Sequence, residues 1–393
     1  MANVRIHHQA RPIGLLCFEE KLAREAGNHS AYRIGSCILT LYVAPVVTTF
    51  GVLLNVLCFM IIFTKIQAER SSSDVVETKR QANEPGPSRR GASSHVRGQQ
   101  DAMAARERAL HYPYVLCWCV CDTLQLIMAV FVLVLPVVQV FLSSASGGRH
   151  DAWLLSAIIV YTVPFLYPSM LTLNFMSVGV AAVLTIERTM AVRRWTKAEA
   201  RFGDVRPHRH VLIVGLVFVW ALMCNASRFF EYRWEARPDG TVDLRTNEQL
   251  KENQSYDLLV NKVLYPAVLL LAPVCILLPL SIVTRIRLVK LANRLRNDPR
   301  TMLPSEHHLR EERFSGMLIA WLITYIVAHA GAVCLRLVKN RNWILTAEFQ
   351  FAKDCSNTLF NLGPLVNPII YMSFTRCFRE FAEEVLVWVA NET

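Results

Sequence analysis

Polar residues interrupt stretches that are otherwise apolar, and they are the residues of this chain that could do chemistry. Asp122 is a carboxylate within an apolar run, and Asn367 directly precedes Pro368 in the last such run. An ionisable or amide group at membrane depth is costly unless it faces the interior of a helix bundle and finds a partner. A proline within a helix also frees a backbone carbonyl that needs a new donor. The pattern predicts a polar centre inside a bundle whose last helix is kinked.

Further polar residues occupy other apolar runs. Asn55 lies in the first run, Glu187 and Arg188 end the third, and Tyr371 follows Pro368 by one turn. These groups suit hydrogen bonding and ion pairing between helices. The sequence contains no glycine-rich phosphate loop, no zinc-ligand spacing and no Ser-His-Asp arrangement. We therefore expect a protein that is not an enzyme and needs no cofactor.

The elements that must position these residues are long apolar segments. The chain has 393 residues and is 53% hydrophobic, and a helix of about 20 apolar residues crosses a bilayer. We count seven such segments, so the predicted fold class is an all-α membrane protein with a seven-helix transmembrane bundle. The segments lie at roughly 37–64, 113–142, 154–187, 209–227, 258–284, 316–338 and 355–372.

Charge distribution predicts how the bundle is oriented. Lys and Arg are more frequent in the connecting segments that lie inside when the N-terminus is outside. The net charge of +11 is then explained by this bias rather than by nucleic-acid binding. We expect residues 1–36 outside without a cleavable signal peptide, a receptor domain over 37–372, and a cytoplasmic tail over 373–393. Within that domain, the polar segment 65–110 is predicted to be a disordered intracellular insertion.

Modification sites are predicted at both ends of the chain. Asn28 and Asn253 begin Asn-x-Ser sequons in segments expected outside. After Tyr371, phenylalanines spaced for one helical face predict a short amphipathic eighth helix on the membrane surface. Cys377 lies beside that face and is a candidate for palmitoylation.

The order of the polar residues resembles that of rhodopsin-like G-protein-coupled receptors. The resemblance covers nearly all of the chain outside 1–34 and 65–110. The stretches 184–192 and 225–232, together with the residues that enter the last run, are similar to the FMRFamide-receptor branch of invertebrate neuropeptide receptors. The positions that carry the resemblance are Gly51, Asn55, Asp122, Glu187, Arg188, Trp220, Asn367, Pro368 and Tyr371.

The resemblance implies a switch at the cytoplasmic ends of the helices. Arg188 resembles the arginine that holds the resting bundle and later meets the G protein, with Glu187 as its local partner. Glu311, at the start of the sixth run, is a candidate clamp across the bundle. Asp122, Ser177 and Asn367 match three positions of the family's sodium pocket. Other positions of that pocket have changed, so sodium binding and a protonated Asp122 remain equal alternatives.

Several positions depart from the family pattern. Thr189 replaces the tyrosine that follows the arginine, and Gly331 replaces the proline that kinks the sixth helix. Val163 and a loop over 225–262 without a usable cysteine partner lack both halves of the usual outer disulfide. Without that bridge, the loop is expected to be more mobile.

A peptide is the ligand class that the resemblance favours. The third run has no acid at the position that biogenic-amine receptors need, and acidic side chains with aromatic neighbours suit a cationic peptide ending in Arg-Phe-amide. His329 is either a structural hydrogen-bonding residue or a group on the pocket floor. The pocket candidates are Tyr167, Met170, Asn174, Phe230, Glu231, His329 and Asp354.

The sequence thus predicts a plasma-membrane receptor that binds an extracellular peptide and activates a heterotrimeric G protein. One alternative is a divergent protein of the receptor fold that no longer couples, which the changes at Thr189, Gly331 and Val163 would explain. A transporter or channel with seven spans is the other, and it would require charged residues along a continuous path through the bilayer.

Overall fold

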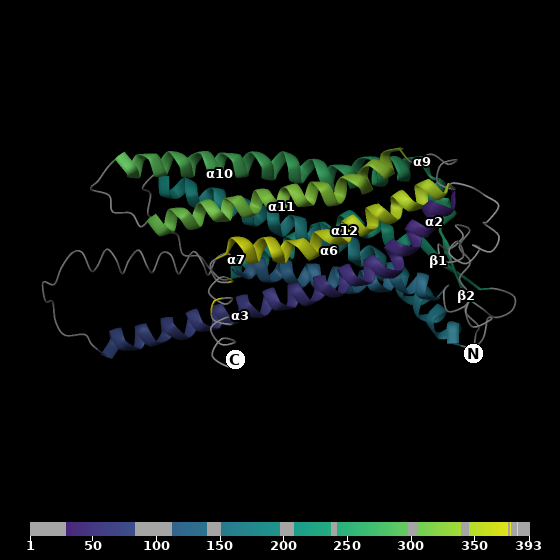
Figure 1. The fold of residues 1–393 in the computed structure, drawn as a ribbon, viewed down its shortest axis with the longest axis horizontal. Helices are drawn as coiled ribbons and strands as arrows, with labels where there is room; N and C mark the ends of the chain where they lie inside the picture. Colours follow the sequence, from purple (N-terminus) through teal and green to yellow (C-terminus); the bar gives the residue numbers. More distant parts are fainter. Residues whose placement is uncertain are drawn as a thin grey trace, which may run out of the picture.

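Long helices that run side by side make up nearly all of the molecule (Figure 1). The computed structural model describes most of the chain, and all statements below concern that part. The described residues are 29–82, 112–139, 151–196, 208–236, 242–297, 305–338 and 346–375, with Phe378 and Glu383.

The first half of the chain forms four helical rods. Helix α2, the π-helical turn η3 and helix α3 follow one another without a break, and a second rod spans Tyr112–Gln139 with the π-helical turn η4 inside it. Helices α6 and α7 come next, and a 3-10 turn, η5, closes α7. The bounds are α2 His29–Ile38, η3 Leu39–Val43, α3 Ala44–Ala82, η4 Val130–Val134, α6 Asp151–Thr196, α7 His208–Asn225 and η5 Ala226–Phe230.

The second half begins with a β-hairpin and continues with three long helices. Strands β1 and β2 pair antiparallel, with Trp234 opposite Leu244. Two π-helical stretches, η6 and η7, precede α10. The bounds are β1 Tyr232–Ala236, β2 Val242–Thr246, α8 Glu248–Glu252, α9 Gln254–Tyr256, η6 Asp257–Leu264, η7 Ala267–Leu271, α10 Ala272–Asn297, α11 Ser305–Val338 and α12 Ala347–Phe374.

Six of the described helices are long and apolar enough to cross a membrane. They confirm an all-α, membrane-embedded protein. The predicted seventh span corresponds to α12, which has 28 residues and is therefore long enough, but asparagines at 357, 361 and 367 lower its hydropathy. The six spans are Ile34–Ala68, Tyr112–Gln139, Leu155–Met190, Arg209–Phe230, Gln254–Lys290 and Arg313–Val338.

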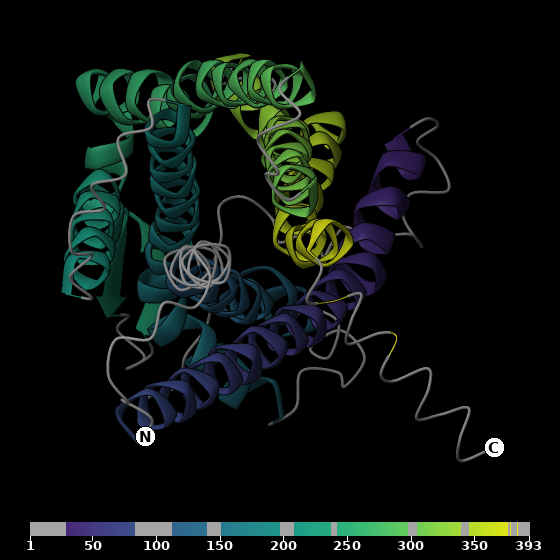
Figure 2. The ribbon, with the colours of Figure 1, turned by 90° about the vertical axis from the view of Figure 1, so that its left-hand side faces the viewer.

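The helices pack into one bundle. Helix α12 packs against α11, α3 and α2, while α6 packs against α7 and α10, and α10 also packs against α11. The view along the bundle shows this arrangement, with α10 and α11 on one side and α3 on the other (Figure 2). The most apolar part of α6 is 72% buried, against 17% for that of α7. Helix α6 is therefore the central helix, and α7 offers most of its surface to lipid.

One predicted boundary was wrong. Helix α3 continues to Ala82, so residues 65–82 are helical although 65–110 was predicted to be disordered. Elongating a helix that is already nucleated adds one hydrogen bond per ordered residue and costs little. The polar composition of this segment excluded a packed core, but it did not exclude a solvated helix. Residues 83–111 lie outside the described part of the chain.

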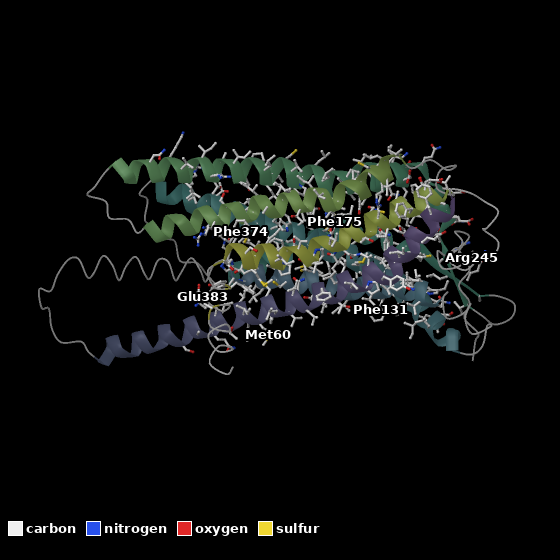
Figure 3. All side chains as sticks on the ribbon, viewed as in Figure 1. Met60, Phe131, Phe175, Arg245, Phe374 and Glu383 are labelled. Carbon is white, nitrogen blue, oxygen red and sulfur yellow. The ribbon has the colours of Figure 1, made fainter. Side chains whose placement is uncertain are left out.

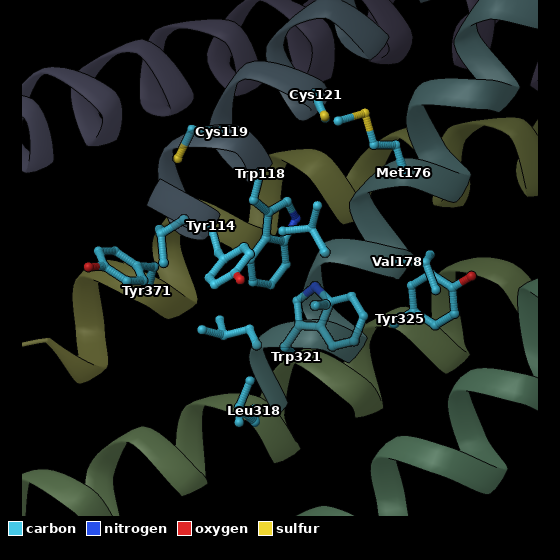
Figure 4. Packing of buried hydrophobic residues seen from close by; sticks show 14 of the residues in the cluster. Tyr114, Trp118, Cys119, Cys121, Met176, Val178, Leu318, Trp321, Tyr325 and Tyr371 are labelled. Atoms are coloured by element: carbon cyan, nitrogen blue, oxygen red, sulfur yellow. The ribbon is translucent and has the colours of Figure 1, made fainter. Parts of the chain in front are cut away.

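Two ends of the bundle are distinguished below. The Arg188 end also carries Phe374, and the hairpin end carries β1 and β2, with Arg245 on β2 (Figure 3). Phe175 of α6 lies between these ends and is 1% exposed. The largest apolar cluster connects the spanning helices. Within it, the indole rings of Trp118 and Trp321 meet edge to face, with centroids 5.1 Å apart (Figure 4).

Candidate functional site

A side chain from another helix supplies the hydrogen bond that Pro368 removes from the backbone of α12. Pro368 has no N–H, so the carbonyl of Pro364, four residues earlier, loses its helical donor. Asn55 of α3 donates its Nδ2 to that carbonyl oxygen at 2.8 Å and to the carbonyl of Gly51 at 2.8 Å. The amide of Asn55 is 1% exposed. The expectation that the freed carbonyl requires a partner within the bundle is confirmed.

Asp122 joins three helices at one point. Ser177 of α6 donates to its Oδ1 at 2.9 Å, and Asn367 of α12 donates to its Oδ2 at 2.7 Å. The carboxyl group is 1% exposed, so these bonds replace the water that it would otherwise bind. The sequence correctly predicted that Asp122, Ser177 and Asn367 meet. We call these three residues the Asp122 junction.

The hydrogen-bond pattern of the Asp122 junction does not fit a sodium ion. A hard cation requires oxygen lone pairs directed at it. Here Ser177 and Asn367 both direct hydrogens at the carboxylate. Among the described residues no group of three or more His, Cys, Asp or Glu side chains could hold a metal either. The arrangement suits a hydrogen-bonded carboxyl group.

A second polar layer lies one helical turn from the Asp122 junction. Asn174 precedes Ser177 by three residues on α6, and Gln125 follows Asp122 by three residues, so both layers use the same helix faces. Asn174 Nδ2 lies 3.4 Å from Gln125 Oε1 and 3.3 Å from His329 Nε2. Because His329 Nδ1 lies 2.9 Å from the carbonyl of Tyr325, Nδ1 donates there and Nε2 accepts from Asn174. Gln125 was missed, although its spacing from Asp122 was a usable signal.

His329 also ends a column of aromatic rings. The rings of Trp321, Tyr325 and His329 follow one another on α11 every four residues, with centroids 5.2 and 4.0 Å apart. Trp118 closes one end of the column at 5.1 Å, and Phe360 of α12 closes the other at 5.0 Å. Trp118, Trp321 and Tyr325 of this column belong to the apolar core (Figure 4), and His329 stacks on Tyr325. The structure therefore supports the structural alternative for His329.

At the Arg188 end, a buried cation lies against an aromatic ring. Arg188 is 4% exposed, and its guanidinium carbon lies 4.6 Å from the centre of the Phe314 ring on α11. Glu187 accepts a hydrogen bond from Tyr114 at 3.1 Å and faces Arg209 of α7 at 3.5 Å. The structure thus brings Arg188 to Phe314 of α11, where the sequence named Glu311 as the candidate clamp, and it places Glu187 among groups that the sequence did not indicate.

Other predicted residues of the Arg188 end are placed in part. Tyr371 is 7% exposed and belongs to the apolar core. Thr189 follows Arg188 on α6, and its hydroxyl oxygen is 2.9 Å from that of Thr284 on α10. Glu311 belongs to α11, but its side chain lies outside the described part. Phe378 packs against the core; most of the predicted amphipathic helix, with Cys377, is not described.

The hairpin end contains a buried ion pair. Arg228 Nη1 donates to Glu231 Oε1 at 2.8 Å, and the two side chains are 3% and 8% exposed. Tyr256 donates its hydroxyl to the same carboxylate oxygen at 2.8 Å. Glu231 was predicted to offer its carboxylate to a cationic ligand, and in this structure the carboxylate is paired with Arg228 instead. Adjacent sequence positions gave no sign that Arg228 folds back onto Glu231.

The remaining pocket candidates do not form one surface. Met170 is 4% exposed, whereas Phe230 is 68% exposed. Tyr167 meets the ring of Tyr232 edge to face at 6.2 Å. Asp354 is buried on α12 and accepts a hydrogen bond from Ser36 of α2.

Only one of the two predicted glycosylation sites lies in the described part of the chain. Asn253 is exposed and caps α9, where its Oδ1 accepts from the backbone N–H groups of Ser255 and Tyr256. Asn28 lies outside the described residues.

Apolar packing attaches the hairpin to α6. In the family that the sequence resembles, a disulfide usually lies at this place, and both of its cysteines are missing here. Leu244 of β2 is 4% exposed and forms a small apolar cluster with Ile159, Val160 and Val163. Trp234 of β1 also donates its indole N–H to the carbonyl of Val160 at 3.1 Å. Val163, the residue in the cysteine position, is thus part of the attachment.

No protein-family model matches the chain, and no curated protein is significantly similar to it.

Proposed function

We propose that the protein is a seven-helix receptor of the plasma membrane that binds an extracellular ligand and activates a heterotrimeric G protein. The Asp122 junction is the observation that carries the proposal. It connects the second spanning helix, α6 and α12 beside the proline kink that Asn55 completes. A few directional bonds between helices at a hinge allow two discrete arrangements of a packed bundle.

In this proposal α12 is the seventh span. Its asparagines lower its hydropathy, yet α12 packs against α11, α3 and α2, and polar residues are tolerated in a span where they face other helices. The hairpin end lies outside, with the N-terminus, and the Arg188 end faces the cytosol. Asn253 then lies on the glycosylated side of the membrane, and Cys377 lies on the side where palmitoylation occurs.

Arg188 is the residue that we assign to coupling. In the described arrangement its guanidinium lies against Phe314, a contact of about 1–2 kcal/mol when it is partly desolvated. An interaction of that size can be exchanged for a partner's contacts without disrupting the fold. Movement of α11 away from α6 would free the guanidinium for the G protein, and ligand binding would bias that movement.

The ligand class remains a proposal as well. A peptide is consistent with the wide range of polar and aromatic side chains at the hairpin end, which include Tyr232, Tyr256 and Asn247. Neuropeptides of the Arg-Phe-amide type are the first set to test, because the resemblance in residues 184–232 points to them.

A G-protein activation assay tests the proposal. Cells that express the full chain are exposed to a neuropeptide library, and nucleotide exchange on G proteins is measured. We expect at least one peptide to activate the wild-type protein, and Arg188→Ala to abolish the response at equal surface expression. Arg285→Ala changes an exposed arginine on α10 and should respond as the wild type does. An unchanged response in Arg188→Ala would contradict the proposed coupling.

A second candidate function is a protein of the receptor fold that binds ligand without coupling. The observation that favours it is the uninterrupted course of α11 from Ser305 to Val338, through Gly331. A sixth helix without a kink has less reason to swing. Binding of a library peptide without nucleotide exchange on any G protein would support this alternative.

A further inference from the structure

Two guanidinium groups converge at the hairpin end. Arg228 Nη2 donates to Asn261 Oδ1 at 3.1 Å, and Arg336 Nη1 donates to the same oxygen at 2.9 Å. Both groups also lie over the ring of Tyr265, with guanidinium carbons 5.5 and 3.6 Å from its centre. Three helical segments, η5, η6 and α11, therefore bring two positive charges to one place.

The acids nearby balance only one of these charges. Glu231 pairs with Arg228 at 2.8 Å. Asp257 faces Lys262 at 3.5 Å and accepts a hydrogen bond from Asn261 at 3.0 Å. In the described part of the chain, the carboxylate nearest in effect to Arg336 is Glu231, which it shares with Arg228, and its other contacts are with Asn261, the face of Tyr265 and the Tyr167 hydroxyl. This site therefore carries one positive charge in excess.

Both guanidinium groups would attract an additional anion at this place. Like charges within a few ångströms repel, and the repulsion is stronger where protein replaces water. The π faces of tyrosines and a neutral amide oxygen offset only part of it. An arginine also presents five N–H donors in a planar fork that matches a carboxylate, and the contacts of Arg336 with Asn261 and with the Tyr167 hydroxyl leave some of these donors available.

We infer that Arg336, with Arg228 behind it, binds the carboxylate of an acidic ligand at the hairpin end. This inference rests on the proposed receptor function, since it names the chemistry of the ligand that the receptor would bind. It also replaces the expectation of a cationic ligand, because the carboxylate of Glu231 is occupied by Arg228 and Tyr256. A ligand carboxylate above Tyr265 restores charge balance and receives paired N–H donors.

Thermal unfolding of the full-length protein in detergent tests the carboxylate site directly. The probe is sodium benzoate, with benzamide as a neutral molecule of the same shape and sodium chloride as the ionic-strength control. We expect benzoate to raise the unfolding temperature saturably by about 2–4 °C, as expected for a ligand that binds only the folded state. Benzamide and sodium chloride should produce no such rise.

Two variants show whether Arg336 is responsible. Arg336→Gln should lose the benzoate-dependent rise, and Arg336→Lys, which keeps the charge but not the planar fork, should retain a reduced rise. Arg245→Gln removes an exposed arginine at the same end and should keep the full rise. If benzoate gives no specific rise in the wild type, or if the rise persists in Arg336→Gln, the inference is overturned.

The outcome of the unfolding measurement does not depend on whether the protein activates a G protein. The unfolding measurement contains no G protein, so a carboxylate site can be found in a protein that fails the activation assay. Conversely, activation by an amidated, cationic peptide together with an absent benzoate effect would support the proposed function and overturn this inference.

Discussion

The middle of the bundle and its hairpin end are held together by different interactions. In the middle, helices are joined by hydrogen bonds from amides and a hydroxyl: Asn55 to a backbone carbonyl, and Ser177 and Asn367 to Asp122. At the hairpin end, the connections are charged, and Arg228, Glu231 and Arg336 meet around Asn261. The same fold thus contains one region with a buried acid and another in which a buried ion pair lies beside a second guanidinium group.

The difference shows what each region can do. A hydrogen bond between neutral groups is worth about 0.5–1.5 kcal/mol, and one to a charged group about 1.5–3 kcal/mol, so the middle can exchange single partners at a modest cost, which suits a hinge. A buried ion pair is far more costly to break than to keep, so the contact between Arg228 and Glu231 holds the hairpin end in one arrangement. The comparison predicts that substitutions in the two regions differ in size and in the property that they change.

The largest effect is expected from Arg228→Ala. It leaves the Glu231 carboxylate buried without its cation, which costs about 3–5 kcal/mol of unfolding free energy. The matched control is Arg245→Ala, since Arg245 pairs with Glu235 at 2.8 Å but both side chains are more than 40% exposed. Denaturation of the purified protein in detergent measures both. Equal losses in the two variants would remove the distinction between buried and exposed pairs on which the comparison depends.

Leu244→Ala should weaken the attachment of the hairpin without unfolding the bundle. Removing a buried leucine side chain costs about 2–5 kcal/mol, and the small cluster on α6 has few other members to compensate. Hydrogen exchange of residues 232–246 should become faster while exchange in α6 stays unchanged. Leu258→Ala, at a residue that is 58% exposed, should leave both unchanged, and faster exchange in α6 of Leu244→Ala would contradict the local effect.

Asn55→Ala tests the middle of the bundle. It removes the donor to the Pro364 carbonyl, and a buried acceptor without a partner costs about 1–3 kcal/mol. Thr48→Ala is the control, because the Thr48 hydroxyl donates at 2.9 Å to the carbonyl of Ala44 within its own helix. A loss in Asn55→Ala no greater than that in Thr48→Ala would mean that the kink carbonyl does not need Asn55.

The smallest effects are expected at two glycines of the bundle. A Cβ at Gly331 would lie 3.5 Å from Ser356 Oγ, an ordinary contact, so Gly331→Ala should be neutral or stabilise α11 by up to about 1 kcal/mol. A Cβ at Gly51 would lie 2.6 Å from Leu126 Cδ1, so Gly51→Ala should destabilise. The difference in unfolding temperature between the two variants measures this contrast, which would disappear if Leu126 could move freely.

The middle of the bundle could largely be predicted from the sequence, and the hairpin end could not. Asp122 and Asn367 are recognisable because a polar side chain within an apolar run must find a partner, and the spacing of Ser177 from Arg188 supported the match. Asn261 and Arg336 lie near the ends of apolar runs, where charged and amide side chains are usual. Their meeting depends on the π-helical turns of η6, which shift the helix register and leave no signal in hydropathy. The extension of α3 was missed for a related reason, since a solvated helix has the composition of a loop.

The apolar attachment of the hairpin determines how it responds to thiol reductants and how it can move. Neither strand contains a cysteine, so thiol reductants should leave the hairpin on α6, and an oxidising compartment is not required to place it. Leu244 and Trp234 can lift from α6 and return without breaking a covalent bond. Because apolar contacts weaken on cooling, the hairpin should open more often in the cold than a disulfide-linked one would.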